Sequence, residues 1–454
     1  MEKKRSSFTG KIGFVLAAAG SAVGLGNIWR FPYLAAKYGG GTFLLIYIIL
    51  SVTFGFALMV AEIGIGRKTQ LSAIGAFGKL NKKFSFIGYL AALIPILILP
   101  YYSVIGGWVT KYFYAFISGS GKTAATKDYF GNFISSASEP LLWFAIFIGA
   151  TALIVLFGVE KGIEKVSKVM MPVLIFLSIG IAVYTMFIPG AMDGVLHYIT
   201  PDFSGMTAEK LIMTIVAAMG QLFYSMSLAM GIMITYGSYM KKEVSIESSV
   251  HQIEIFDTGI AFLAGLMIIP AVSVFSPEKL GTQAGPGLMF ETLPSIFADM
   301  PGGGIIGAVF FVLVLFAALT SSISLMETVV SIFQDKFKWN RKISCLVVLA
   351  VCIILGLPSS LGYGPWATVK IIGMQFLDLF DFISNSILMP IAALLTCVFV
   401  GFIIKPKAIS DEVQLSGKFA LKPLFNVMIK YIAPICLLLI LASSILSAFG
   451  IIKI

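Results

Sequence analysis

Long apolar stretches separated by short polar segments run along the whole chain. A helix needs about 20 mainly apolar residues to cross the hydrocarbon core of a bilayer. None of the stretches alternates strictly between apolar and polar residues, as the strands of a membrane β-barrel do. We therefore expect an all-α polytopic membrane protein with eleven transmembrane helices, at roughly 12–36, 42–66, 86–117, 141–158, 167–188, 209–238, 250–275, 303–335, 344–357, 376–403 and 427–449.

Composition and charge agree with a membrane location. Of the 454 residues, 58% are hydrophobic and 12% charged, which a water-soluble domain could not bury. The net charge is +10, and most Lys and Arg residues lie in segments that face the cytoplasm if the N-terminus does. The positive-inside rule then places the C-terminus outside and explains the excess of basic residues, so we expect the lipid bilayer, and not nucleic acid, as partner.

The first apolar stretch is expected to remain as a span and not to be cleaved as a signal peptide. It is long, lacks a cleavage site of small residues and contains Asn27 and Arg30. Cysteines occur only within apolar stretches, where they are expected to pack in the core: Cys345, Cys352, Cys397 and Cys436.

Two of the expected helices carry interruptions. The first contains the glycine-rich run Gly20–Asn27, and the sixth contains the run Ser225–Gly231. Each glycine costs a helix about 1 kcal/mol relative to alanine, and an unwound segment in lipid must find partners for its carbonyls and amides. A bound cation and a ligand carboxylate would satisfy them. Interruptions at corresponding places in two halves indicate an inverted-repeat transporter, although Gly20 and Gly24 also fit a helix-packing motif.

Ionisable groups inside apolar spans usually mark a pathway or a paired site. Those requiring an explanation are Arg30, Glu62, Asp257, Glu327 and Asp381. Sodium prefers oxygen ligands, and these could come from freed carbonyls and from Asn27, Ser225, Asp257, Thr320 and Ser321. Because His197 and His251 are isolated and no pair of nucleophile and base is recognisable, we expect no enzyme activity.

One long motif makes the chain recognisable. The run from Ala19 to Pro32, AGSAVGLGNIWRFP, followed by Gly39–Gly41, resembles the first-helix signature of the neurotransmitter:sodium symporter family. Further matches follow in order over nearly the whole chain: Glu62 with Gly66 and Arg67, Tyr101 and Tyr102, Gly220 to Phe223, Ile234 to Tyr239, and Leu319 to Ser322. The resemblance implies a single transporter domain built from two inverted five-helix repeats with unwound first and sixth helices. The repeats would cover about 12–188 and 209–403, and 427–449 would be an additional helix.

The resemblance also implies two sodium sites. The first, here called the Thr320 site, would use the carbonyls of Gly20, Val23 and Ala317 and the hydroxyls of Thr320 and Ser321. The second, here called the Asp257 site, would use Ala22, Asn27, Ser225 and Asp257 together with the substrate carboxylate. A shared carboxylate would make the binding of ion and substrate interdependent.

A substrate pocket follows from the same resemblance. Amine transporters of the family have an aspartate where this chain has Gly24, so a substrate that brings its own carboxylate, an amino acid, is expected. Tyr102 would donate to that carboxylate. No charged side chain would face the substrate side chain, which favours an apolar or aromatic one. The complete expected set is Ala22, Gly24, Gly26, Ile98, Tyr102, Tyr224, Ser225, Ser227, Met230, Ser321 and Leu325.

Two departures from the family pattern bear on anion dependence and pocket size. Chloride-dependent relatives have a serine where this chain has Ala261, whereas Tyr47, Gln221 and Ser225 match. We expect ionised Asp257, one helical turn earlier, to replace chloride. Ala229 stands where relatives usually have glycine, and its role stays open, as does that of Glu327.

Gates are expected at both ends of the pathway. The resemblance pairs Arg30 with Asp381 outside, covered by Tyr102 and Tyr224, and Arg5 with Asp335 inside, near Phe8 and Tyr239. Such pairs contribute little energy as surface contacts, but a few kcal/mol is enough to shift a gate between states.

The sequence thus predicts a sodium-coupled symporter of a neutral amino acid, with two sodium ions, no chloride requirement and no obligatory protein partner, in a bacterial inner membrane. A proton-coupled amino-acid carrier of the same fold, with Asp257 or Glu62 titrating, is the main alternative. An ion channel or sensor is an alternative from a different class.

Overall fold

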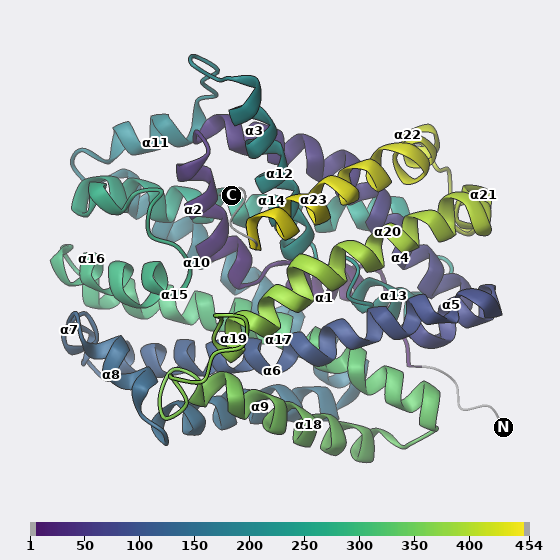
Figure 1. Ribbon diagram of the computed structural model, residues 1–454, viewed down its shortest axis with the longest axis horizontal. Coiled ribbons are helices and arrows are strands. Elements are labelled where there is room, and N and C mark those ends of the chain that lie inside the picture. The colour runs from purple at the N-terminus through teal and green to yellow at the C-terminus, as the bar shows by residue number, and fades with distance from the viewer. Residues whose placement is uncertain (1–5, 449–454) are drawn as a thin grey trace.

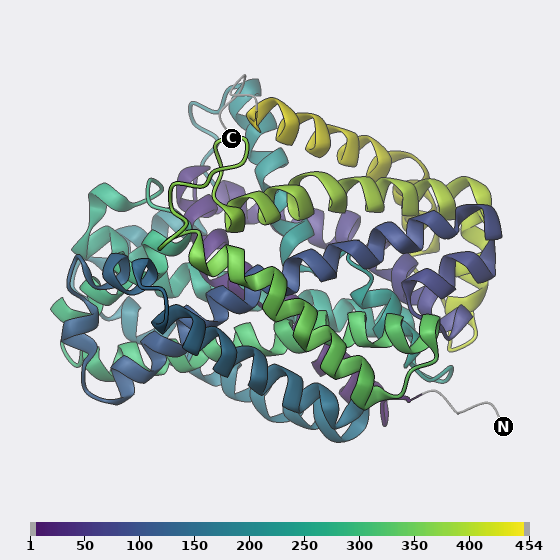
Figure 2. The ribbon, with the colours of Figure 1, turned by 60° about the horizontal axis from the view of Figure 1, so that its bottom comes forward.

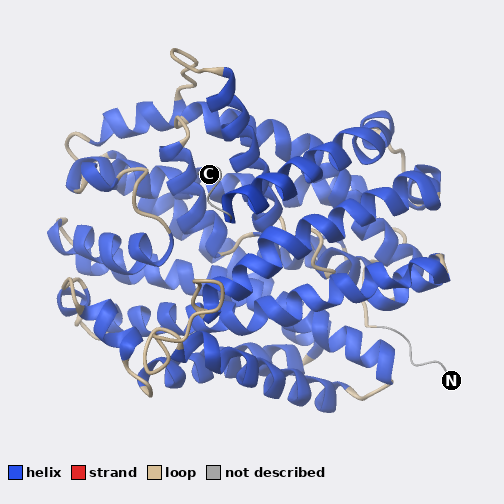
Figure 3. Ribbon diagram, in the orientation of Figure 1, coloured by secondary structure: helices blue, strands red, loops and turns tan. Residues whose placement is uncertain are grey.

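The protein was analysed as a computed structural model that describes residues 6–448. Within this range the chain is helical, and its only strand-like pairings are isolated bridges between Gly40 and Pro201 and between Ile371 and Met374 (Figure 3). The all-α prediction is therefore confirmed.

Nine helices of the described residues are long and apolar enough to cross a membrane. They are Gly41–Thr69, Lys82–Ile117, Glu139–Leu156, Val159–Met186, Ile246–Phe275, Gly303–Phe337, Arg341–Leu361, Phe376–Ile403 and Lys422–Ser447. A tenth span results if Lys11–Ala22 and Gly26–Lys37, bent by 52° relative to each other, are counted as one. The expected span 209–238 is divided between α12 (Ala208–Ser225) and α13 (Ile232–Ser238). Neither piece alone meets the requirement, so the structure does not confirm a count of eleven.

The long helices lie side by side along the longest axis of the molecule, in both views (Figures 1 and 2). At the centre, α1 (Lys11–Ala22) packs against α10 (Lys165–Met186), α14 (Ile246–Phe275) and α17 (Gly303–Phe337). Helix α6 (Ser85–Ile117) packs on α17, on α9 (Glu139–Leu156) and on α18 (Arg341–Leu361). Helices α20 (Met389–Val398) and α23 (Ala433–Ala448) pack on each other.

Shorter helices complete the chain. They are α2 (Phe31–Lys37), α3 (Gly41–Leu50), α4 (Phe56–Thr69), α5 (Ala73–Leu80), α7 (Gly121–Ala124), α8 (Tyr129–Ser135), α11 (Ala191–Ile199), α15 (Gly285–Gly287), α16 (Leu293–Asp299), α19 (Phe376–Asp381), α21 (Lys405–Gln414) and α22 (Lys422–Val427). π-Helical turns join several of them, at Gly26–Arg30, Ser51–Gly55, Val159–Glu164, Leu288–Thr292, Phe382–Leu388, Phe399–Ile403 and Met428–Ile432.

The first interruption begins where α1 ends at Ala22. Val23 adopts an extended backbone with ψ 101°, and the helix resumes only with the π-helical turn that starts at Gly26. Asn27 stabilises the gap from within, because its Oδ1 accepts a hydrogen bond from Gly24 N at 3.0 Å. The predicted unwinding of the first helix is therefore present.

The second interruption lies between α12 and α13. Ser227, Ala229 and Gly231 all have left-handed backbones, with φ of 53°, 62° and 73°. Such a conformation costs a residue with a side chain about 1–3 kcal/mol. Two of the three residues are not glycine, so the surrounding contacts must hold this segment in place.

Candidate functional site

The two interruptions face each other across a small central cavity. Its volume is about 30 Å³, and the lining residues are Ser21, Ala22, Gly24, Leu25, Gly26, Asn27, Ile98, Tyr102, Tyr224, Ser225, Ser227, Met230, Ile232, Ser321 and Leu325. All residues expected to bind substrate are among them. Ser21, Leu25 and Ile232 were not expected. The position of Ser21 within the Gly20–Asn27 run was a signal that could have revealed it.

Glycine is required at two positions of the cavity wall. A Cβ at Gly24 would lie 2.7 Å from Ser321 Oγ and 3.2 Å from Tyr102 Oη. A Cβ at Gly26 would lie 2.5 Å from Tyr224 Cδ1. The first interruption is therefore packed closely against α6, α12 and α17, and no side chain of its own enters at these points.

Tyr102 connects α6 to the first interruption. The tyrosine is 4% exposed, and its Oη accepts a hydrogen bond from Leu25 N at 3.4 Å. The hydroxyl proton is left to donate into the cavity. The Tyr102 hydroxyl is therefore a donor available to a ligand acceptor in the cavity, whereas the Leu25 amide is already bonded.

The residues of the expected Asp257 site are in direct contact. Asp257 is fully buried, and its carboxylate accepts hydrogen bonds from Asn27 Nδ2 at 2.7 Å, Tyr47 Oη at 2.9 Å and Ser225 Oγ at 3.3 Å. Within residues 6–448, neutral polar groups thus surround this carboxylate and no cationic side chain pairs with it. A buried carboxylate is costly unless paired, and a cation bound next to it would pair it.

The residues of the expected Thr320 site also come together. Ser321 Oγ lies 3.3 Å from Val23 O, and Thr320 Oγ1 lies 3.1 Å from Ala317 O. A Cβ at Gly20 would approach Thr320 Cβ to 3.2 Å, so both helices are in close contact there. The oxygen atoms are carbonyls and hydroxyls, which are ligands suited to sodium. Among the described residues no group of three or more His, Cys, Asp and Glu could hold a metal ion.

The two residues of the expected outer gate contact other side chains in this structure. Arg30 lies over the ring of Tyr224, with 5.6 Å from Cζ to the centroid. Asp381 instead accepts hydrogen bonds from Tyr101 Oη at 3.1 Å and from Asn385 Nδ2 at 2.5 Å. No ion pair between Arg30 and Asp381 is present among the described residues, and their role as a gate stays a prediction.

The inner pair is only partly covered by the structure. Arg5 lies outside the described residues, whereas Asp335 Oδ2 accepts a hydrogen bond from Ser72 N at 2.7 Å. Phe8 is 1% exposed and packs edge-on against Tyr236 and Tyr239 at 5.6 and 6.2 Å between ring centroids. The pairing of Arg5 with Asp335 stays a prediction.

Two buried carboxylates that the sequence left unexplained have partners. Glu62 Oε1 accepts a hydrogen bond from Ala229 N at 2.6 Å, so α4 holds the second interruption at one of its strained residues. Glu327 forms an ion pair with Arg341 and accepts a hydrogen bond from Tyr239 Oη at 2.7 Å. The partner of Glu62 is a backbone amide, which no sequence pattern identifies.

Comparisons with known proteins agree with this geometry. A profile described as the sodium:neurotransmitter symporter family matches residues 5–127 and 132–451. The uncharacterized sodium-dependent transporter YhdH of Bacillus subtilis is 36% identical, with 97% of each chain covered. A sodium-dependent transporter of Haemophilus influenzae is 33% identical, with 97% of this chain and 98% of the relative covered. The crystal structure of MhsT in complex with L-phenylalanine superposes with a TM-score of 0.87 and 37% identity, over 97% of this chain and 100% of MhsT.

Proposed function

Because the chain belongs to the sodium:neurotransmitter symporter family, we propose that it couples sodium entry to the uptake of a neutral amino acid with an apolar or aromatic side chain. The observation that carries this proposal is the central cavity, which both interruptions line and whose described lining residues include no charged side chain. Free backbone amides and carbonyls can hold the carboxylate and ammonium groups common to amino acids, so only the substrate side chain has to be distinguished.

Substrate class follows from what surrounds the substrate side chain. Ile98, Met230 and Leu325 supply apolar surface, and Tyr224 supplies an aromatic ring. A charged substrate side chain would be buried there without a partner, at a cost of several kcal/mol. The complex of MhsT with L-phenylalanine supports the same class.

Coupling to sodium would take place at the two oxygen-rich sites. The substrate carboxylate would complete the Asp257 site, and each sodium ion would contribute roughly 2.3 kcal/mol per 100 mV of membrane potential. Ionised Asp257 would supply the fixed negative charge that chloride supplies in other relatives, so no chloride requirement is expected. The excess of basic residues on one side supports a cytoplasmic N-terminus, and the bacterial relatives support an inner membrane.

A binding screen of the twenty amino acids in sodium and then in potassium tests this proposal. We expect one or a few apolar or aromatic amino acids to bind in sodium only, and binding to persist when gluconate replaces chloride. If no amino acid binds in sodium, the substrate proposal is wrong. A collapse in gluconate would contradict only the role given to Asp257.

One observation favours a proton-coupled carrier as the second candidate. Glu62 is buried, and its Oε2 has no hydrogen-bond partner among the described residues, so this oxygen is available to take up a proton. Uptake measured with and without sodium at fixed pH separates the two candidates. Concentrative, saturable uptake in proteoliposomes would exclude a channel.

A further inference from the structure

A second and much larger cavity lies away from the central site. Its volume is about 860 Å³, and it shares no lining residue with the central cavity. The walls come from the end of α2, from α11, from the loop that follows α11 and from the first turns of α12. Cavities of 300–1,000 Å³ are typical of sites for small molecules.

Positive charge dominates the lining. Lys37 and Lys210 both face the cavity, with His197 between the chain segments that carry them, and Asp202 is the lining carboxylate. Asp202 Oδ1 already accepts a hydrogen bond from Ser204 N at 2.7 Å, and hydrogen bonding to Ser204 holds the pKa of Asp202 below its usual range. Among the described residues, neither lysine has a carboxylate within ion-pair distance. An anion placed here would therefore find two ammonium groups against one carboxylate, with the Lys37 ammonium 5.7 and 5.1 Å from the ring centroids of Tyr33 and Tyr38.

Exposed apolar side chains surround the cavity. Leu196 and Ile199 on α11, Phe203 in the loop and Ile212 on α12 are 51, 41, 54 and 60% exposed. Figure 1 shows the loop between α11 and α12 projecting from the upper edge of the molecule, beside the long helices. Exposed apolar patches of this kind mark surfaces that contact a membrane or a ligand, so an occupant of the cavity meets both charge and apolar surface.

From this combination we propose that the cavity binds the headgroup phosphate of an anionic phospholipid from the adjacent leaflet. The two lysines contact the phosphate, and the acyl chains lie along the exposed apolar side chains of α11 and α12. Lysine side chains attract anionic lipid headgroups by charge, and lysines can reach such groups while their stems stay in an apolar surface.

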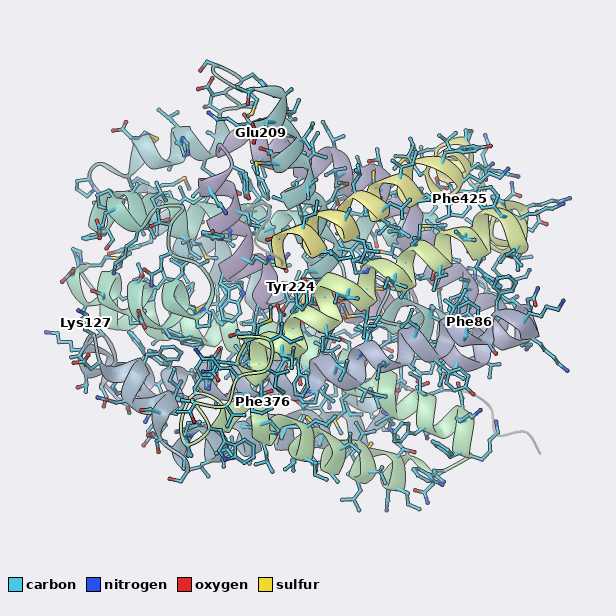
Figure 4. The ribbon with its side chains drawn as sticks, viewed as in Figure 1. Phe86, Lys127, Glu209, Tyr224, Phe376 and Phe425 are labelled. Atoms are coloured by element: carbon cyan, nitrogen blue, oxygen red, sulfur yellow. The ribbon has the colours of Figure 1, made fainter. Side chains whose placement is uncertain are left out.

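The position of the cavity connects this lipid to transport. Lys37 ends α2, and the segment before α2 begins at Gly26 in the central cavity. Lys210 lies in the first turn of α12, which ends with Ser225 in the central cavity. Figure 4 places Glu209 at the upper edge and Tyr224 near the centre, so α12 runs from one cavity to the other. A phosphate that bridges both lysines thus holds the far ends of both interrupted helices.

The loop that follows α11 is held to the segment that follows α2. Thr42 Oγ1 donates to Asp202 O at 2.8 Å and accepts from Asp202 N at 3.0 Å. Gly40 pairs with Pro201, and a Cβ on Gly40 would approach His197 O to 2.1 Å. Bound lipid would therefore connect the first turn of α12 to the end of α2 and the loop packed against it, and it should favour the arrangement in which the lysines converge.

Lipid retention tests the proposal without relying on the transported substrate. Phosphatidylglycerol and phosphatidylcholine vesicles are offered to the detergent-purified full chain, and retained lipid is measured by mass spectrometry. One juxtamembrane lysine strengthens binding about fivefold. We expect the variant Lys37→Gln/Lys210→Gln to retain phosphatidylglycerol at least tenfold less than the wild type. Lys127→Gln, an exposed lysine at another edge (Figure 4), is the matched control and should bind normally.

Two further measurements complete the experiment. Inorganic phosphate should not displace the lipid at equal concentration, since the apolar contacts are missing, and displacement would identify a site for free anions. Uptake in proteoliposomes should respond to phosphatidylglycerol in the wild type and in Lys127→Gln, but not in the double variant. Equal retention by double variant and wild type overturns the proposal, provided both unfold at the same temperature.

Discussion

Asn27 donates a hydrogen bond of 2.7 Å from Nδ2 to Asp257 Oδ1, between residues 230 positions apart in the chain. Asn27 belongs to the first interruption and Asp257 to the middle of α14, and both are fully buried. The amide of Asn27 thus has two roles, because its Oδ1 accepts from Gly24 N on the other side. Ion binding at Asp257 would therefore change the shape of the interrupted helix directly.

Replacing Asp257 by asparagine tests this connection. The variant keeps the size of the side chain but removes the negative charge at the Asp257 site, so we expect sodium affinity to fall about tenfold or more, with chloride unable to restore it in a site that has Ala261 in place of serine. Sodium-dependent thermal stabilisation measures the effect. Glu254→Gln, one turn earlier on α14 and paired with His251, is the control. Unchanged sodium affinity in Asp257→Asn would refute the role of the carboxylate.

Gly24 provides a test of where the substrate carboxylate binds. An aspartate there would place a second carboxylate beside Tyr102 and Ser321, so we expect Gly24→Asp to abolish amino-acid binding through repulsion and crowding. Gly24→Ala separates the two causes, because it brings the Cβ 2.7 Å from Ser321 Oγ without charge and should weaken binding less. Competition with a radiolabelled amino acid measures both. Equal losses in the two variants would show that crowding alone acts.

Backbone strain in the second interruption makes Gly231 a sensitive position. With φ +73°, an alanine there would be strained and its Cβ would lie 3.3 Å from Ala73 Cβ. We expect Gly231→Ala to lower the free energy of unfolding by about 1–2 kcal/mol. Gly220 within α12 has nothing within 4 Å of an added Cβ, so Gly220→Ala should be neutral or stabilising by up to about 1 kcal/mol. Thermal unfolding in detergent measures the stability of both variants. If Gly220→Ala were less stable than Gly231→Ala, the strain assigned to Gly231 would be contradicted.

Two substitutions of Glu62 distinguish a structural hydrogen-bond acceptor from a residue that must titrate. Glutamine keeps an oxygen that can accept from Ala229 N, whereas alanine leaves this buried amide without a partner at a cost of about 1–3 kcal/mol. We expect Glu62→Gln to keep sodium-dependent binding and Glu62→Ala to lose both stability and binding. The amplitude of sodium-dependent uptake by each variant is the measurement that distinguishes the two roles. If glutamine is as damaging as alanine, the charge of Glu62 is required and the proton-coupled alternative gains support.

Sequence patterns determined the class of this protein. Apolar stretches long enough to span a bilayer need no tertiary contact to be recognised, and the glycine-rich run from Gly20 to Asn27 indicated an unwound helix, which the backbone at Val23 shows. The motif around that run also identified the family, and the residues expected to bind substrate line one cavity. The division into inverted repeats and the roles of the two ion sites stay predictions.

Tertiary structure decided which partner each buried polar group has. Arg30 lies on Tyr224 and not against Asp381, and Glu62 binds the backbone of Ala229, because the nearest available partner depends on how the helices pack. Every residue except proline has a backbone amide, so the sequence does not indicate which amide binds a carboxylate. Opposite charge alone does not show which of two possible partners a side chain contacts when their distances are unknown. Hydrophobicity is a property of each residue and can be read from the sequence. A hydrogen bond depends on the positions of two atoms, and only the packed fold determines these.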